Sequence, residues 1–354
     1  MQGSALRRLV GGVATAGAVL LAVGVGAPAQ AAPPDRFNVV PLVSDQVGEA
    51  PLVDKNVVNA WGLALSPTGP LWVANNGTNT ATVYAGGVNG ATPTKVPLTV
   101  DVNTDGPTGQ VFNDTAGFVI PGSTKALFIF DSEEGDITAW NPSLGTKAAV
   151  VAHVEGANYK GLAILHLGAA AFLLAADFHN ARIDVFDAAF HRVPDASASF
   201  TDPGLPKGFA PFNAFTVGAA VYVAYAMQDE DAEDEVAGRG LGFVDRFDGL
   251  TGRVERIASR GTLNAPWGMA IAPASFGKFA GALLVGNFGD GHIGAYRGGD
   301  FLGLLRMRRG GAVRVDGLWA LQPGTAATGG AGTLWFSAGP DEETHGLVGE
   351  ILPA

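Results

Sequence analysis

Three tryptophans occupy one recurring position in the sequence, near the start of short apolar segments. They are Trp61 in AWGLAL, Trp267 in PWGMAI and Trp319 in LWALQP, and we align Lys160 and Asn213 with them in two further segments. An indole ring stacks on the flat face of a sugar, while an ammonium or an amide forms hydrogen bonds with hydroxyl groups. If the five positions converge, they would bind a sugar or another flat polyhydroxylated ligand. The alternative is that the indoles pack against one another, and Lys160 would still need an anionic or amide partner.

Acidic residues gather at two further places and suggest a calcium site. Asp131 and Asp177 each follow an apolar segment, and the loop at residues 228–235 adds four more candidates: Asp229, Asp231, Asp234 and Glu235. Carboxylate oxygens that converge from several segments match what this hard cation requires. Turn capping by aspartate, and a loop that is simply solvated, explain the same pattern without a metal. Both interpretations stay open on the sequence alone.

A partial calcium-loop pattern occurs at residues 101–106, DVNTDG. Its twelfth position is Phe112, where a bidentate glutamate belongs. We therefore expect a turn rich in Asp and Asn at this place.

The composition excludes several classes of function. The chain of 354 residues contains no cysteine, so a disulfide framework, a cysteine-ligated zinc and a thiol nucleophile are impossible. Its 33 acidic and 22 basic side chains give a net charge of −11, which leaves no basic surface for nucleic acid. The sequence also has no G-x-S-x-G or H-E-x-x-H motif and no phosphate-binding glycine loop. The identity of any catalytic residue is therefore unknown at this stage.

The elements that must position these side chains come from an internal repeat. A glycine-containing apolar strand, a turn and a second strand recur six times, and we align the copies on Trp61, Ala116, Lys160, Asn213, Trp267 and Trp319. Each copy continues with a third strand and most with a fourth. Four-stranded units at this spacing, rich in turn residues and without helical periodicity, predict an all-β fold, a six-bladed β-propeller with four strands per blade.

The two ends of the repeat favour a closed ring over the alternative, an array of β-sandwiches. The sixth copy ends at Ile351 without room for a fourth strand, whereas residues 37–44, FNVVPLVS, precede the first copy and resemble an outer strand. We expect this N-terminal strand to complete the last blade, which would remove the open sheet edge. Residues 32–354 would then form a single propeller domain.

The first 31 residues have the features of a signal peptide. Arg7 and Arg8 precede an apolar stretch at residues 9–25, and Ala29-Gln30-Ala31 fits the small-x-small cleavage rule. No later stretch is apolar for the length of a membrane span. We therefore expect a secreted protein, extracellular or retained in the periplasm or cell envelope, that acts as a monomer.

Several segments resemble known propeller families. LLAADFHNARIDVFD, which starts at Leu173, resembles an NHL repeat, and the layout is similar to propellers of the gluconolactonase and strictosidine-synthase type. NVVNAWGLALSPTGPLWVANN, YAMQDEDAEDEVAGRGLGFVDRFD and GTLWFSAGPDEETHGLVGEI resemble an uncharacterised family of secreted bacterial propeller proteins. This second resemblance implies a fold and export but no activity.

The gluconolactonase-like resemblance bears on a metal. Those propellers hold a metal at the channel through a glutamate, an asparagine and an aspartate, and Asn213 is similar to one such ligand. Trp61, Trp267 and Trp319 depart from that pattern, because they offer no oxygen to a metal.

Two functions follow as hypotheses. The first is a secreted propeller that binds a small molecule, a glycan or an extracellular protein or polymer at its channel mouth, with calcium as a possible stabilising ion. The second is a metal-dependent hydrolase or lactonase.

Overall fold

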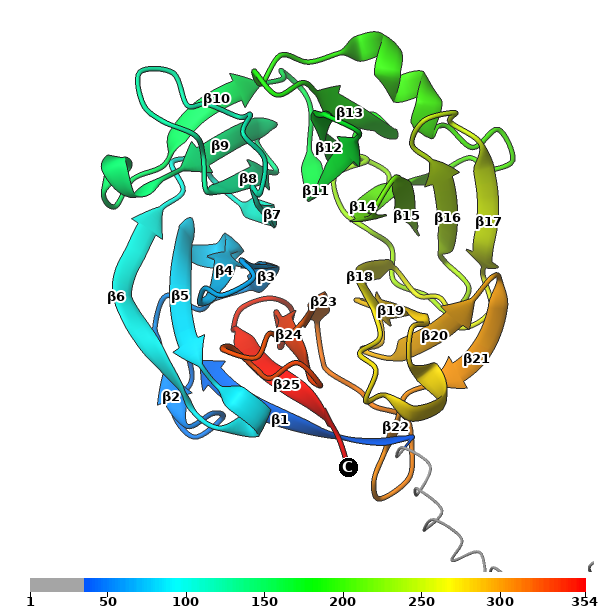
Figure 1. Ribbon diagram of the computed structural model, residues 1–354. Helices are drawn as coiled ribbons and strands as arrows, with labels where there is room; N and C mark the ends of the chain where they lie inside the picture. The colour runs from blue at the N-terminus through cyan, green and yellow to red at the C-terminus, as the bar shows by residue number, and fades with distance from the viewer. Residues whose placement is uncertain (1–34) are drawn as a thin grey trace, which may run out of the picture. The chain divides into compact units, whose positions relative to one another are not determined.

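The computed structural model describes residues 35–354, and the predicted signal peptide at residues 1–31 lies outside them. Six twisted antiparallel sheets surround a central channel (Figure 1), which confirms the predicted all-β, six-bladed propeller. In blades one to five the strands follow one another in the chain from the channel outwards, so the innermost strand comes first, whereas the sixth blade takes its outermost strand from the N-terminal end of the propeller.

The strands of the first three blades, from the channel outwards, are β3 (Ala60–Leu65), β4 (Leu71–Asn75), β5 (Thr80–Gly86) and β6 (Pro93–Asp101); β7 (Pro107–Phe112), β8 (Phe128–Ser132), β9 (Asp136–Trp140) and β10 (Ala149–His153); and β11 (Tyr159–Leu167), β12 (Ala170–Asp177) and β13 (Arg182–Phe186). The third blade has three paired strands, and the 3₁₀ helix η4 (Pro194–Phe200) follows β13 on its outer side.

The strands of the last three blades are β14 (Phe209–Val217), β15 (Ala220–Met227), β16 (Phe243–Asp248) and β17 (Val254–Ser259); β18 (Pro266–Ile271), β19 (Leu283–Asn287), β20 (Ile293–Arg297) and β21 (Asp300–Leu304); and β23 (Leu318–Pro323), β24 (Leu334–Ala338), β25 (Leu347–Pro353) and β1 (Arg36–Ser44). Two short strands, β2 (Leu52–Val53) and β22 (Arg306–Met307), pair with β1.

The N-terminal strand closes the ring as predicted. β1 pairs antiparallel with β25 from Phe37 opposite Pro353 to Ser44 opposite Leu347. The last blade therefore combines strands from the two ends of the described chain, and the outer edge of β25 is paired.

Glycines in the inner strands allow adjacent blades to come close at the channel. A Cβ on Gly62 would lie 2.4 Å from the carbonyl oxygen of Thr108, and one on Gly268 would lie 2.4 Å from that of Trp319. Neither space admits a methyl group, so the inner strands require glycine there. Large apolar side chains fill the space between blades farther out, as where Trp72 of blade one stacks on Phe128 of blade two at 4.1 Å between ring centroids.

No helix among residues 35–354 is long and apolar enough to cross a membrane.

Candidate functional site

The three tryptophans meet at the centre of the propeller. Trp61 and Trp319 stack with ring centroids 3.6 Å apart, and Trp267 meets both rings edge-on at 6.3 and 5.8 Å. All three side chains are buried, with at most 4% of their surface exposed. The rings therefore plug the channel, in line with the packing alternative, and present no free face on which a sugar could stack.

In two blades, the residue equivalent to these tryptophans is not the one that the sequence alignment indicates. Each inner strand has an irregularity near its start, and the residues there are Trp61, Thr108, Lys160, Phe212, Trp267 and Trp319. The alignment of Ala116 was wrong because it lies in the loop after β7, and the alignment of Asn213 was wrong by one residue.

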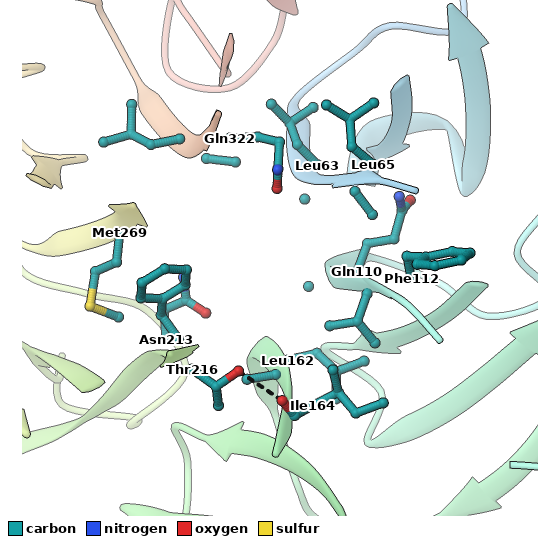
Figure 2. A pocket seen from close by; sticks show the side chains of 18 of the residues that line it. Leu63, Leu65, Gln110, Phe112, Leu162, Ile164, Asn213, Thr216, Met269 and Gln322 are labelled. Carbon is teal, nitrogen blue, oxygen red and sulfur yellow. Dashed lines mark hydrogen bonds between the residues drawn. The ribbon is translucent and has the colours of Figure 1, made fainter. Parts of the chain in front are cut away.

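Asn213 takes part in backbone hydrogen bonds near the plug. Its Nδ2 donates to the carbonyl of Trp267 at 2.9 Å, and its Oδ1 accepts from the backbone N–H of Ala214 at 2.8 Å. Asn213 and Trp267 also line a cavity on the side of the plug where the inner strands end, which we call the lower face (Figure 2). Both polar atoms of Asn213 thus hydrogen-bond to backbone, and its role as the metal ligand that the gluconolactonase resemblance implies stays a prediction.

Lys160 lies at the opposite end of the channel, where the inner strands begin, which we call the upper mouth. Only 1% of its side chain is exposed, and its Nζ lies 2.5 Å from Glu133 Oε1 and 3.1 Å from Asp234 Oδ1. The ammonium also lies 5.6 Å from the ring centroid of Trp61. The partner that the sequence required for Lys160 is therefore a pair of carboxylates from the two neighbouring blades.

Electrostatics keeps this lysine charged. Burial alone would lower the pKa of Lys160, but the negative charges of Glu133 and Asp234 outweigh that effect and raise it to about 12. A lysine in this state is not a nucleophile at neutral pH. Its role at the upper mouth is that of a fixed cation.

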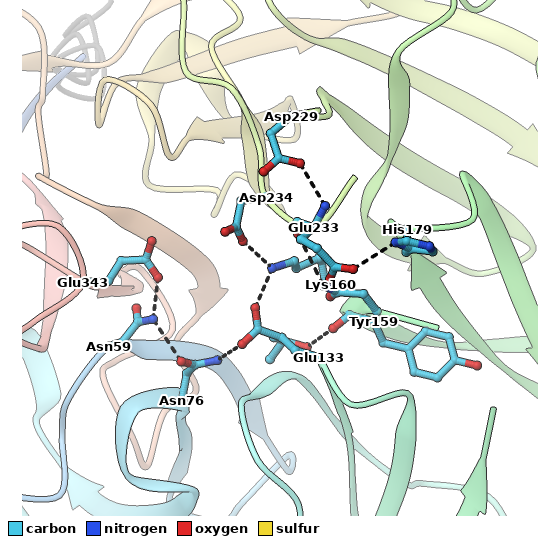
Figure 3. Close-up of polar contacts among 12 residues, drawn as sticks. Asn59, Asn76, Glu133, Tyr159, Lys160, His179, Asp229, Glu233, Asp234 and Glu343 are labelled. Carbon is cyan, nitrogen blue, oxygen red and sulfur yellow. Dashed lines mark hydrogen bonds and ion pairs between the residues drawn. The ribbon is translucent and has the colours of Figure 1, made fainter. Parts of the chain in front are cut away.

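A chain of hydrogen bonds extends from Lys160 across the upper mouth (Figure 3). Glu133 accepts from Asn76 Nδ2 at 2.9 Å, and Asn76 in turn accepts from Asn59 Nδ2 at 3.2 Å. Asn59 Nδ2 also donates to Glu343 at 2.6 Å, and Asn59 Oδ1 accepts from the indole N–H of Trp319 at 2.8 Å. The plug below and the carboxylates above are thereby joined in one network.

Carboxylates outnumber the ammonium at the upper mouth. Glu133, Asp234, Glu235 and Glu343 all interact electrostatically with Lys160. Burial, with the charges of Glu343 and Asp234 acting in the same direction, raises the pKa of Glu235 to about 8. Burial, followed by the charges of Glu133 and Asp234, also raises the pKa of Glu343. We call these four carboxyl groups and Lys160 the mouth cluster. Glu235 is mostly protonated at neutral pH, and the other three carboxyl groups still outnumber the one ammonium, which favours the uptake of a cation.

The residues predicted as metal ligands are spread over different environments. Asp131 is buried and accepts from the backbone N–H of Gly109 at 2.6 Å, and Asp177 is buried and paired with Arg182 at 2.8 Å. Asp177 also accepts from the backbone N–H of Asn180 at 3.1 Å, which matches the turn-shaping interpretation, whereas Asp131 links β8 to the adjacent strand β7 and does not cap its own turn.

The acidic loop at residues 228–235 is likewise not arranged as a metal site. Asp229 accepts from the backbone N–H of Glu233 at 2.9 Å and Asp231 is exposed, whereas Asp234 and Glu235 join the mouth cluster. Within residues 35–354, no three His, Asp or Glu side chains are grouped so as to hold a metal ion. Calcium therefore stays a prediction that rests on the density of carboxylates.

The DVNTDG segment forms the expected turn. The backbone N–H of Asn103 donates to Asp101 Oδ1 at 2.8 Å. Asp101 and Asp105 line a surface hollow together with Asp136 and His153.

Relatives were found among viral proteins. No family model matches the sequence. The chain is 32% identical to the uncharacterised protein R648 of Acanthamoeba polyphaga mimivirus, over 88% of this chain and 78% of that protein. It is also 32% identical to the uncharacterised protein L690 of the same virus, over 88% of this chain and 84% of that protein. The chain belongs to the family of these mimivirus proteins. The relatives' names state no activity, and the resemblance to secreted bacterial proteins and to NHL repeats stays a prediction.

Solved structures match this family's fold at low sequence identity. An α-L-arabinanase from Penicillium chrysogenum superposes with a TM-score of 0.53 and 10% identity, over 88% of this chain and 98% of that one. A streptogramin B lyase superposes with a TM-score of 0.50 and 11% identity, over 89% and 96% of the two chains. These likenesses show the propeller fold alone.

Four members of the network were not identified as site residues in the sequence analysis. They are Asn59, Asn76, Glu133 and Glu343. Asn76 and Glu133 follow β4 and β8, at the same end of the second strand as Asp131 and Asp177. Asn76 and Glu133 could have been predicted by including the one or two residues that follow this position, because every loop between a second and a third strand reaches the upper face.

Proposed function

We propose that this chain is an exported binding protein whose upper mouth receives a positively charged group of its ligand, an ammonium or a guanidinium. The observation that carries the proposal is the place of Lys160: a buried ammonium held between Glu133 and Asp234, with Glu235 and Glu343 beside it. One cation balances only part of this charge. A second cation near Asp234, 73% of whose side chain is exposed, would find an attractive potential already in place.

The same features argue against a sugar as the ligand at this mouth. The indoles that would stack on it are buried in the plug, and the accessible groups are carboxylates. The ligand class is therefore shifted from the glycan expected from the sequence to a basic small molecule or a basic segment of a protein.

Binding of two basic probes tests this function. We expect spermine and an octalysine peptide to bind in titration calorimetry, with an affinity that falls as salt rises because exposed charges are screened. Glu133→Gln and Asp234→Asn should each weaken binding about fivefold to tenfold, since each removes one charge from the mouth. The two probes distinguish a small polyamine from a polypeptide as the source of the positive group.

A matched control is Asp300→Asn, which removes an exposed carboxylate at the rim of blade five, in β21. It should leave binding unchanged. The proposal would be abandoned if neither probe binds, or if Asp300→Asn weakens binding as much as Asp234→Asn does.

Export is part of the proposal and is supported by the leader pattern at residues 1–31. Expression of the full chain in a bacterial host, followed by N-terminal sequencing of protein from the periplasm and the medium, should yield a chain that starts at Ala32. Full-length protein confined to the cytoplasm would contradict export.

Calcium is proposed as an ion that orders the acidic loop at residues 228–235. Its support is the run of carboxylates from Asp229 to Glu235, which repel one another unless a cation or solvent compensates them. The ion would use side chains that are exposed in the present arrangement, and Asp231 is one of them.

A hydrolase is the second candidate, and one observation favours it. Glu235, whose pKa is raised to about 8, lies next to Asp234, so a protonated and an ionised carboxyl group share the mouth. Such a pair can act as general acid and general base. Turnover of a panel of lactones and esters, with added Ca²⁺, Mg²⁺, Mn²⁺ or Zn²⁺, tests the predicted metal-dependent form, and activity without metal that is lost in Glu235→Gln would favour the acid–base form.

A further inference from the structure

Positive charge gathers at one place on the rim of this acidic molecule. The chain has a net charge of −11, yet Arg306, Arg308 and Arg309 lie within four positions. All three are exposed, and β22, which contains the first of them, lies at the outer rim of the ring beside β1 (Figure 1). Arg36 of β1 is also exposed and pairs in register with Arg306. We call these four arginines the basic turn.

The backbone of the basic turn is fixed to the ring. The N–H of Gly310 donates to the carbonyl of Met307 at 3.0 Å, so Arg308 and Arg309 are the two central residues of a tight turn. The N–H of Arg308 donates to the carbonyl of Phe37 in β1, also at 3.0 Å. Two guanidinium groups are therefore presented to solvent on a support that is already ordered.

Little of this positive charge is compensated. Asp35 lies 3.8 Å from Arg36 and also 3.8 Å from Lys278, so one carboxylate serves two cations. Among residues 35–354, no carboxylate forms an ion pair with the other three arginines of the basic turn. Like charges that lie side by side repel one another, and guanidinium groups form strong paired hydrogen bonds with carboxylates. The basic turn thus favours a partner that carries several carboxylates.

The same chain presents such a surface at its upper mouth. The tip of the acidic loop at residues 228–235 carries Glu230 and Asp231, which are exposed and form no ion pair with any described residue. Asp234 of the same loop pairs with Lys160 but keeps 73% of its side chain exposed. The molecule therefore has two exposed surfaces of opposite charge, on different blades.

We propose that the basic turn of one copy of this chain binds the acidic loop at the upper mouth of a second copy. This inference rests on the proposed function, because it names the positively charged ligand of that mouth as the guanidinium groups of Arg308 and Arg309. The two surfaces differ, so the contact is head-to-tail and a bound pair can add further copies. The monomer expected from the sequence would then describe only dilute protein.

The salt dependence of self-association tests the contact. A contact through one turn and one loop is smaller than a stable interface, so the association is weak and transient. Two acidic molecules without a complementary contact repel one another most at low salt, whereas contacts between opposite charges are strongest there. Sedimentation velocity and static light scattering of the protein should therefore show association at about 0.05 M NaCl that is lost at about 0.5 M.

A double variant assigns the association to the basic turn. Arg308→Glu with Arg309→Glu should weaken self-association at least about tenfold, because both charges of the turn are reversed. The matched control, Lys147→Glu with Arg253→Glu, makes the same change in net charge at two exposed positions on other blades and should retain the association. The turn variant should still bind octalysine, because its upper mouth is unchanged.

A charge exchange tests the pairing of the two surfaces directly. Glu230→Lys with Asp231→Lys reverses the tip of the acidic loop. Neither this variant nor the turn variant should associate with itself, but an equimolar mixture of the two should associate, since each positive surface then meets a negative one. Melting curves like that of the parent protein would show that both variants are folded.

Three results would overturn the proposal. They are no association of the parent protein up to about 1 mM at low salt, equal association of the turn variant and the parent, and a mixture of the exchange variants that stays dissociated. Octalysine binding by a parent protein that does not associate would reject this inference alone, whereas the absence of both would also reject the proposed function. Binding to phosphatidylglycerol vesicles through the basic turn, without self-association, would instead assign the turn to an anionic membrane.

Discussion

Replacement of Lys160 by methionine measures how much the ion pairs of Lys160 in the mouth cluster contribute to the free energy of unfolding. The pKa of Lys160 rises from an ordinary value of 10.5 to about 12. Each pH unit between the folded and unfolded pKa is worth 1.36 kcal/mol, so the folded state favours the charged lysine by about 2 kcal/mol. Because the folded pKa is the higher one, this stabilisation is fully present below pH 10 and is lost only as the pH rises through about 12.

The variant also leaves Glu133 and Asp234 without their shared cation. Breaking a fully buried pair costs about 3–5 kcal/mol, but 31% and 73% of these two side chains are exposed, so solvent screens much of their repulsion. Methionine keeps most of the apolar stem of the lysine. We therefore expect Lys160→Met to lower the free energy of unfolding by about 3 kcal/mol at pH 8.5.

Urea unfolding followed by tryptophan fluorescence, at pH 8.5 and 5.5, measures this loss. The deficit should shrink at pH 5.5, because Glu235 and Glu343, whose pKa values are already raised, take up protons and relieve the repulsion. The control is Lys147→Met, in which an exposed lysine 3.3 Å from Asp101 is removed, and it should cost less than about 1 kcal/mol. A deficit below about 1 kcal/mol for Lys160→Met at pH 8.5, or one that is the same at both pH values, would refute the reasoning.

Three further predictions concern the plug, the last blade and the acidic loop. Trp61→Ala should lower the free energy of unfolding by about 3–5 kcal/mol, as expected for a buried aromatic side chain, and a loss below about 1 kcal/mol in urea unfolding would contradict the plug. Glu350 is buried, and one of its carboxylate oxygens has no hydrogen-bond partner among residues 35–354. Burial raises its pKa to about 8, so its charge opposes folding increasingly between pH 4.5 and 8. Glu350→Gln should therefore unfold at a higher urea concentration than the parent protein at pH 8.5 and at nearly the same concentration at pH 4.5. An equal difference in urea midpoint at the two pH values would contradict this account. Calcium should raise the melting temperature saturably and magnesium should not, and a flat response to calcium after EDTA treatment would remove it from the proposal.

Much of the fold could be predicted because each blade is local in sequence. The apolar strands, their turns and the closing strand at residues 37–44 all leave a pattern in neighbouring residues. The inner strand of blade two was misplaced because Phe118 and Ile120, in the loop after β7, are buried apolar residues that resemble a strand. The true strand, PTGQVF, contains Gln110 and a glycine and is less apolar than the loop that follows it.

The site was predicted less completely because its partners are distant in the chain. The need of Lys160 for an anion followed from its expected burial, but Glu133 and Asp234 come from loops of the two adjacent blades. The glycine that follows Trp61, Thr108, Lys160 and Trp267 marks the true register, and blades four and six depart from that rule with Asn213 and Ala320. Only the packing of all six inner strands shows which side chains meet at the axis.

The pairing of β1 with β25 has a consequence for the order in which the molecule assembles. It joins Phe37 to Pro353, whereas the contacts within each of the other blades span a few tens of residues. Pairing over so long a separation carries a high loop-closure entropy and is slow. Blades one to five can therefore form while later parts of the chain are still being synthesised, whereas the sixth must wait for its last strands, β23 to β25. Until then β1 has no β25 to pair with and presents an unpaired edge, so the interval before ring closure is when the chain is most exposed to aggregation and proteolysis.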